Sequence, residues 1–324
     1  MSFVLLGVSV ALLAYAAAIV VGTAFVAPLL LRAARLPEPA PRARRLVALR
    51  FLPSGFALLT VGGLVVPAFF WLEPRDTVEK VSATMAALAG VGLLMLLAGP
   101  ARGLMSLLST RRLVTRWNRG ALSIEVPGIH LPAFVVNEPF PIVSLVGWFR
   151  PRLVVARTVL EKCDGDELAA VLAHEAGHNE RRDPWVRLLV RACPDLLSMT
   201  PWADRLERAW AEAAEQDADE RAARTGPTRA IDLASALVKV ARLAGAGRPP
   251  AISVSALYRG EGVAGRIARL LEREQRGECD AAPPTRLVAT IGVFALLAFV
   301  PTAAALGLHH QVHGAMEAVV SFFQ

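Results

Sequence analysis

Four long runs without charged residues constrain the fold of this chain more than any other feature. The runs are residues 1–31, 51–72, 81–101 and 287–308. Each has about the length that crosses a bilayer, roughly 20 apolar residues. The first run lacks a basic leading segment and a clear small-residue cleavage site, so we expect it to be retained. The mean hydropathy of +0.46 exceeds that of a soluble enzyme. The sequence therefore predicts a mostly α-helical membrane protein with four transmembrane helices.

The charges that flank these runs predict the orientation, because Lys and Arg near membrane helices stay on the cytoplasmic side. Residues 32–50 carry six Arg against one Glu, and residues 102–119 carry five Arg. By contrast, residues 73–80 are slightly acidic, and residues 309–324 contain no Lys or Arg. We therefore expect both termini to lie outside and residues 109–286 to lie in the cytoplasm.

This topology divides the chain into three parts. Residues 1–108 are predicted to form a three-helix membrane region, residues 109–286 a cytoplasmic domain, and residues 287–324 the fourth helix with a short outer tail. The isoelectric point of about 10.1 does not indicate a nucleic-acid partner, because residues 109–286 contain 26 Lys and Arg against 23 Asp and Glu. Most of the excess positive charge flanks the membrane helices, where we expect it to contact the lipid bilayer.

Residues 174–178 read His-Glu-Ala-Gly-His inside an apolar helical run. Two histidines four residues apart lie on one face of a helix, so both can bind one Zn²⁺ while Glu175 lies beside the open position of the metal. Asp164 and Glu167 form a capping-box pattern in front of this run. The pattern is typical of zinc peptidases, in which the glutamate serves as general base.

A catalytic zinc ion usually has three protein ligands, and the two histidines supply only two. Glu215 and Asp219 lie four residues apart on a later helix, so Glu215 can bind the metal while Asp219 supports the free ring nitrogen of a ligand histidine. Glu212 is the alternative third ligand. The alternative interpretation of this acidic segment is a helix face exposed to solvent.

Three further features are open to more than one reading. Residues 133–137, 141–146 and 152–156 are predicted to be strands of a small sheet beside the zinc helix. Residues 185–197 are predicted to form a core or membrane-surface helix, because this run contains two Arg and is too short to cross a bilayer. The C-terminal histidines predict a polar interfacial tail, with a metal or pH sensor as the alternative; these are His309, His310 and His313.

Together these motifs resemble the antirepressor-type integral-membrane metallopeptidases, the family of the bacterial beta-lactam sensor-transducers. The similarity rests on residues 137–147, 151–155, 174–184, 201–219 and 266–271. The resemblance implies a glutamate-type zinc protease domain in which His174, His178 and Glu215 bind one zinc ion, Glu175 is the general base and Asp219 supports a ligand. It also implies the inner membrane of a bacterial-type cell. The sensor-transducers carry a penicillin-binding domain after the last helix, where this sequence has residues 309–324, so we do not expect direct antibiotic sensing.

Three functions are compatible with these features. The first is a zinc endopeptidase that cleaves a cytoplasmic or membrane protein, such as a transcriptional repressor, in response to a signal. The second is a quality-control protease of the heat-shock or prenyl-protein protease type. The third, a catalytically silent receptor or scaffold, is the weakest because the ligand set is complete. The substrate, the signal and homo-oligomer formation are left open by the sequence.

Overall fold

The computed structural model describes residues 2–75, 81–124, 131–147, 151–194, 196, 202–244, 262–276 and 307–323. Almost all of the predicted fourth transmembrane helix, residues 287–308, lies outside these ranges. The described part is mostly helical and contains one small sheet.

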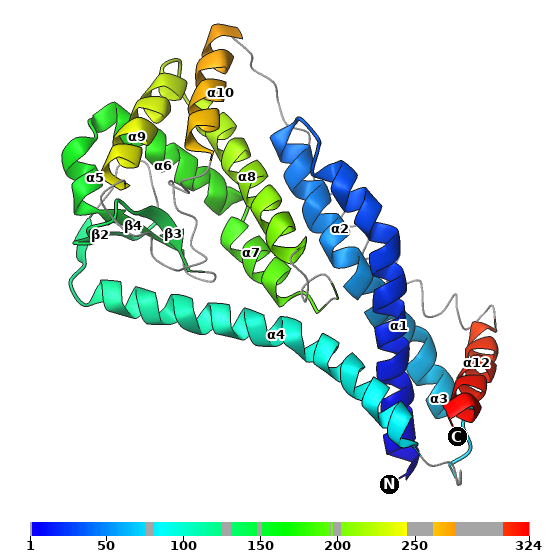
Figure 1. Cartoon of the computed structure of the whole chain (residues 1–324). Coiled ribbons are helices and arrows are strands. Elements are labelled where there is room, and N and C mark those ends of the chain that lie inside the picture. Colours follow the sequence, from blue (N-terminus) through cyan, green and yellow to red (C-terminus); the bar gives the residue numbers. More distant parts are fainter. Residues whose placement is uncertain are drawn as a thin grey trace.

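In the described ranges, three helical segments are long and apolar enough to cross a membrane, and they match the first three predicted spans: Phe3–Ala33, Pro39–Leu72 and Ala83–Trp117. They comprise α1 (Ser2–Ala33), α2 (Pro39–Thr60), the π-helix η1 (Val61–Val65), α3 (Val66–Leu72) and α4 (Ala83–Asn118). The second begins well before its apolar run, because Pro39 lies at the start of the helix, where its missing N–H costs no hydrogen bond. The third also extends beyond its apolar run, and Figure 1 shows it continuing beneath the sheet.

The sheet has four strands in the order β1-β2-β4-β3. The strands are β1 (Leu122–Ile124), β2 (Ala133–Val136), β3 (Val143–Val146) and β4 (Arg152–Ala156). β2 and β4 are parallel, while β1 and β3 run antiparallel to their neighbours. The three predicted strands are therefore confirmed, with shorter bounds for β2 and β3, and β1 was not predicted.

Six helices complete what we call the globular unit, the described residues from Leu122 to Arg276. They are α5 (Arg157–Lys162), α6 (Gly165–Glu180), α7 (Asp183–Ala192), α8 (Trp202–Ala223), α9 (Arg229–Ala244) and α10 (Val263–Arg276). The largest hydrophobic core of the described chain lies between the sheet, α6 and α9. Because α6 is packed from several sides, the side chains that it carries are held in fixed positions.

The globular unit rests on the membrane helices through α7 and α8. α7 packs against α4, and α8 packs against α2. The α4–α7 contact is close enough that a Cβ at Gly99 would lie 2.5 Å from the carbonyl oxygen of Ala192. The sequence predicts a core or membrane-surface helix over residues 185–197, and the structure has α7 over Asp183–Ala192, packed against α4.

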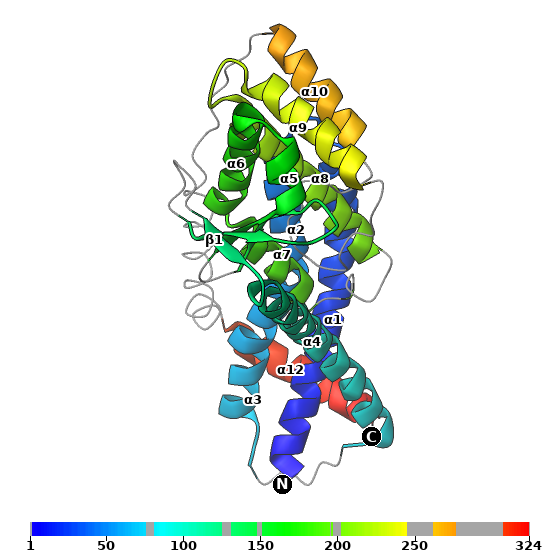
Figure 2. The same ribbon diagram turned by 90° about the vertical axis from the view of Figure 1, so that its left-hand side faces the viewer.

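Residues 308–323 form a helix, α12 (Leu308–Phe323), in place of the polar interfacial tail that the sequence predicts. This helix packs against α3 and η1 because Met316 and Val320 join an apolar cluster with Leu6 and Phe69. α12 and the start of α1 lie at one end of the molecule, and the globular unit lies at the other (Figure 1; Figure 2).

Candidate metal centre

The helix that carries the His-Glu-Ala-Gly-His motif begins with the predicted capping box. Asp164 Oδ1 accepts from the backbone N–H of Glu167 at 3.0 Å, and Glu167 Oε2 accepts from the backbone N–H of Asp164 at 2.9 Å. Ser235 on α9 donates to Glu167 Oε1 at 2.6 Å, and Lys239 donates to Glu167 Oε2 at 2.5 Å. These bonds satisfy the first N–H groups of α6 and tie its start to α9.

The structure brings His174, His178 and Glu215 together. One ligand atom from each of the three residues lies within 4.8 Å of the others. The two Nε2 atoms lie 3.2 Å apart, and the Glu215 oxygens lie 3.4 Å from Nε2 of His174 and 3.6 Å from Nε2 of His178. All three residues are at most 5% exposed. Glu212, the alternative third ligand, has a side chain that is 61% exposed and lies near Arg42 instead.

Each histidine of this centre has a carboxylate beside its other ring nitrogen. Nδ1 of His174 lies 3.0 Å from Asp219 Oδ1. Nδ1 of His178 lies 2.7 Å from Asp183 Oδ2. A carboxylate at Nδ1 holds the imidazole in the tautomer whose Nε2 is free for a metal.

Arg266 on α10 balances the charge of the two carboxylates from α8. Its guanidinium donates to both oxygens of Asp219, at 2.7 and 2.6 Å, and Nη1 lies 3.2 Å from Glu215 Oε2. Burial would raise the pKa of both acids, but the neighbouring histidines and Arg266 outweigh it and hold each pKa below its usual value. Both acids are therefore held as carboxylates.

The pKa values of the two histidines point to a centre that favours positive charge. Burial would lower the pKa of His178, but Glu215 and Asp183 outweigh it and raise the pKa to about 10. The pKa of His174 is also raised, because Asp219 and Glu215 outweigh its burial. A zinc ion beside both Nε2 atoms would supply this positive charge in place of protons.

Glu175 lies next to this centre and has a different environment. Its Oε2 accepts from the backbone N–H of Leu145 at 2.9 Å, on the edge strand β3. Burial raises the pKa of Glu175 to about 6, which is in the range expected of a general base or acid near neutral pH. Its Oε1 is buried and has no hydrogen-bond partner among the described residues.

These residues fit a zinc ion. The two imidazole nitrogens and one carboxylate are a usual set of three protein ligands for catalytic zinc. Both oxygens of Glu215 are buried and neither accepts a hydrogen bond from the described part of the chain, although Oε2 contacts Arg266. A buried carboxylate that lacks hydrogen bonds costs free energy, and a metal ligand role would offset that cost.

Asp183 and Arg266 were not predicted as parts of the centre. The sequence shows Asp183 next to Pro184, which predicts only the end of α6. In the structure Arg182 has a φ of 55°, so the chain turns sharply and Asp183 folds back onto His178. A short acidic residue just after the motif is the signal that could have indicated this role.

Comparison with protein families supports the chemistry that this geometry suggests. Residues 125–206, about a quarter of the chain, match Peptidase family M48. A search of curated proteins found no match. The family match, together with the His/His/Glu group and the apolar helices, supports a membrane-associated metallopeptidase.

Proposed function

We propose that this protein is a zinc endopeptidase of the membrane, with His174, His178 and Glu215 as metal ligands and Glu175 as the general base. The convergence of three buried ligand atoms within 4.8 Å, beside a buried glutamate, is the observation that carries this proposal. A receptor or scaffold without catalysis would have no use for this cluster of buried charge, which is costly unless it serves a function.

Zinc, when bound, would supply a water of lowered pKa and a positive charge beside the peptide carbonyl. Glu175 would take the proton of that water and pass it to the leaving amine. Asp183 and Asp219 would hold the two imidazoles in place through Nδ1, and Arg266 would keep both acids of α8 ionised.

The outer edge of β3, beside Glu175, is the proposed place for the substrate. The backbone N–H of Leu145 points away from β4 toward Glu175, so a peptide added to this edge would pass the general base. Strand addition binds an extended peptide by its main chain, with little demand on its sequence. A flexible segment of another protein fits this requirement better than a folded domain.

We propose four membrane spans, with both termini outside and the globular unit in the cytoplasm. The charge distribution around the apolar runs supports this orientation. The positions of α10 and α12 at opposite ends of the molecule support a fourth crossing between them (Figure 1). A cytoplasmic catalytic centre gives access to cytoplasmic regulators, such as a transcriptional repressor, and to the cytoplasmic parts of membrane proteins.

The test compares newly formed protein N-termini in cells that express the wild-type chain or Glu175→Gln. Glutamine has nearly the same shape but cannot accept the proton, so the variant should keep zinc and lose cleavage. One or a few regulatory proteins as substrates would support signal-dependent proteolysis of the antirepressor type. Many damaged membrane proteins would support quality control instead. Equal sets of N-termini from the two strains would rule out the proposed peptidase.

A further inference from the structure

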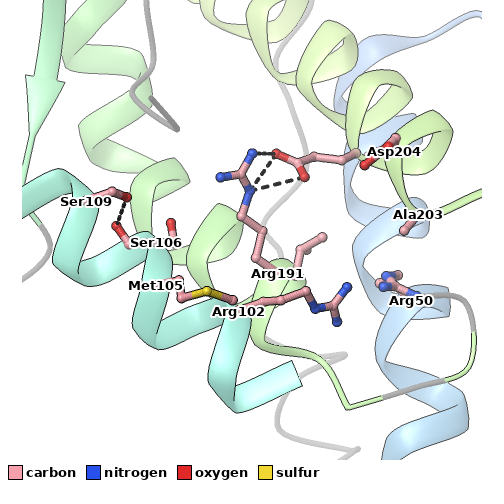
Figure 3. A pocket seen from close by; sticks show the side chains of 10 residues that line it. Arg50, Arg102, Met105, Ser106, Ser109, Arg191, Ala203 and Asp204 are labelled. Carbon is pink, nitrogen blue, oxygen red and sulfur yellow. Dashed lines mark hydrogen bonds and ion pairs between the residues drawn. The ribbon is translucent and has the colours of Figure 1, made fainter. Parts of the chain in front are cut away.

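A second candidate site lies away from the metal centre, where α2, α4, α7 and α8 meet. A cavity of about 430 Å³ lies at this junction, and Figure 3 shows the side chains that line it. Its charged lining consists of Arg50, Arg102, Arg191, Asp204 and Glu207. None of the metal-centre residues lines it. The proposed peptidase chemistry therefore does not explain this cavity.

The depth of the cavity along the membrane helices follows from two of its arginines. Arg50 directly precedes the apolar run 51–72, and Arg102 directly follows the apolar run 81–101. Both therefore mark the end of a membrane span on the side of the globular unit. Arginine at this depth lies level with the lipid headgroups and their phosphates.

The charges around the cavity favour an anion. The described lining residues carry three guanidinium groups and two carboxylates, so their formal charge is net positive. Arg191 is paired with Glu207 at 2.8 Å, and Arg102 donates to the carbonyl oxygens of Ala98 and Cys193, both at 3.2 Å. These contacts hold two guanidiniums in fixed positions at the cavity. Arginine presents five N–H donors in a planar fork, which matches the geometry of a phosphate.

The surface beside the cavity is apolar, as an acyl chain requires. Met105 lines the cavity and is 60% exposed. Leu94 and Leu97 on α4, in the apolar run that ends before Arg102, are also exposed, as is Leu189 on α7. Exposed side chains of this kind at the end of a membrane span favour contact with lipid over contact with water. Ser106 and Ser109, which carry hydroxyl groups, also line the cavity.

We propose that this cavity binds the phosphate of an anionic glycerophospholipid from the leaflet on the side of the globular unit. The phosphate would lie between Arg50 and Arg102, and the acyl chains would extend along the exposed face of α4. A free phosphate ion offers the same headgroup chemistry, but only a lipid accounts for the apolar surface beside the charges.

A lipid bound in this cavity would also stabilise α7. This helix begins at Asp183, which contacts His178, and it ends beside the cavity, where the carbonyl of Cys193 accepts from Arg102. A phosphate held between α2 and α4 would strengthen this end of the junction. We therefore infer that the lipid reduces opening of α7, which connects the membrane surface to the metal centre.

The test uses the delipidated full-length protein in detergent and measures lipid binding by native mass spectrometry. We expect phosphatidylglycerol to bind the wild-type chain about tenfold more tightly than phosphatidylcholine or phosphatidylethanolamine, because its net charge complements the lining. Arg102→Gln and Ser109→Glu should each remove about that tenfold preference. The second variant leaves the buried residues untouched, since Ser109 is exposed.

Two matched variants separate the cavity from general surface charge. Arg111→Gln removes the same charge from an exposed position of the same helix, and Ser109→Gln has the size of the glutamate without its charge. Both should bind phosphatidylglycerol like the wild type. Any of three results would overturn the proposal. The three lipids could bind equally well, Arg111→Gln and Arg102→Gln could weaken phosphatidylglycerol binding equally, or millimolar sodium phosphate could displace the lipid completely.

Hydrogen exchange tests the link to α7 without any reference to activity. In phosphatidylglycerol nanodiscs the amides of residues 186–192 should exchange more slowly than in phosphatidylcholine nanodiscs, and Ser109→Glu should abolish the difference. Identical exchange in the two lipids would show that the lipid does not steady α7.

Discussion

Two histidine pairs of this protein have the same spacing and different surroundings. His174 and His178 lie four residues apart on α6, and His309 and His313 lie four residues apart on α12. In the first pair, both Nε2 atoms lie near Glu215. In the second pair, His309 Nε2 donates to the backbone carbonyl of Gly63 at 3.1 Å. Only the first pair belongs to a group of three possible metal ligands among the described residues.

The reason for the difference lies in what surrounds each ring. Asp219 and Asp183 hold the first pair by Nδ1 and leave Nε2 free for a metal. His309 instead donates through Nε2 to the backbone carbonyl of Gly63 in the π-helix η1, so this ring nitrogen is already engaged. Spacing therefore brings two histidines to one helix face, but carboxylates from other elements decide whether the pair can bind a metal.

The largest expected effect is the loss of zinc from one pair and not from the other. Purified full-length protein should contain about one zinc ion per chain, as three converging ligands imply. His178→Ala should lose most of it, while His313→Ala should keep it. Elemental analysis by mass spectrometry measures both. If His313→Ala lost the zinc and His178→Ala kept it, the assignment of the metal site to the first pair would be wrong.

Removal of Arg266 should have the next largest effect. Arg266→Leu would leave the carboxylates of Glu215 and Asp219 without their buried cation, which costs about 3–5 kcal/mol. A clear fall in melting temperature should follow in detergent. Arg269→Leu, half-buried on the same helix, is the matched control and should cost much less. Equal falls in melting temperature for the two variants would mean that Arg266 does not stabilise the centre specifically.

A smaller effect is expected when the support of His178 is weakened. Asp183→Asn keeps the size of the side chain but removes its charge, so zinc affinity should fall by roughly 10- to 100-fold. Glu73 lies 3.7 Å from Nδ1 of His313, and Glu73→Gln makes the same change at the other pair. Competition with a zinc-binding dye should show weaker binding only for Asp183→Asn.

The smallest effect should come from the second pair. His309→Ala leaves the carbonyl of Gly63 without this donor, which costs about 1–3 kcal/mol of stability. The melting temperature should fall while the zinc content stays unchanged. His310→Ala, an exposed neighbour on the same helix, is the control and should change neither. A loss of zinc from His309→Ala would show that the two pairs are coupled.

These contrasts also mark what the sequence could predict. The zinc motif, its capping box, and the Glu215 and Asp219 pair depend on spacing along single helices, and the structure places these side chains as that spacing requires. Asp183 depends on a left-handed turn at Arg182, a conformation that the residue type does not signal.

Contacts between distant segments were harder to predict. Arg266 reaches Asp219 across 47 residues of chain, and α12 reaches Gly63 across 246. No local periodicity encodes these pairings, because they depend on how the helices pack. The strand β1 was missed because it has only three residues, two of them exposed, so it has no buried alternation to detect.

X-ray absorption at the zinc edge, measured on the full-length Glu175→Gln protein, tests the central claim most directly. The variant removes the proposed general base and should leave the ligands intact. The account predicts two imidazole nitrogens and light oxygen ligands at about 2.0–2.2 Å, with no sulfur. A spectrum that requires sulfur at about 2.3 Å, or more or fewer than two imidazoles, would contradict the assignment of His174, His178 and Glu215 as the zinc ligands.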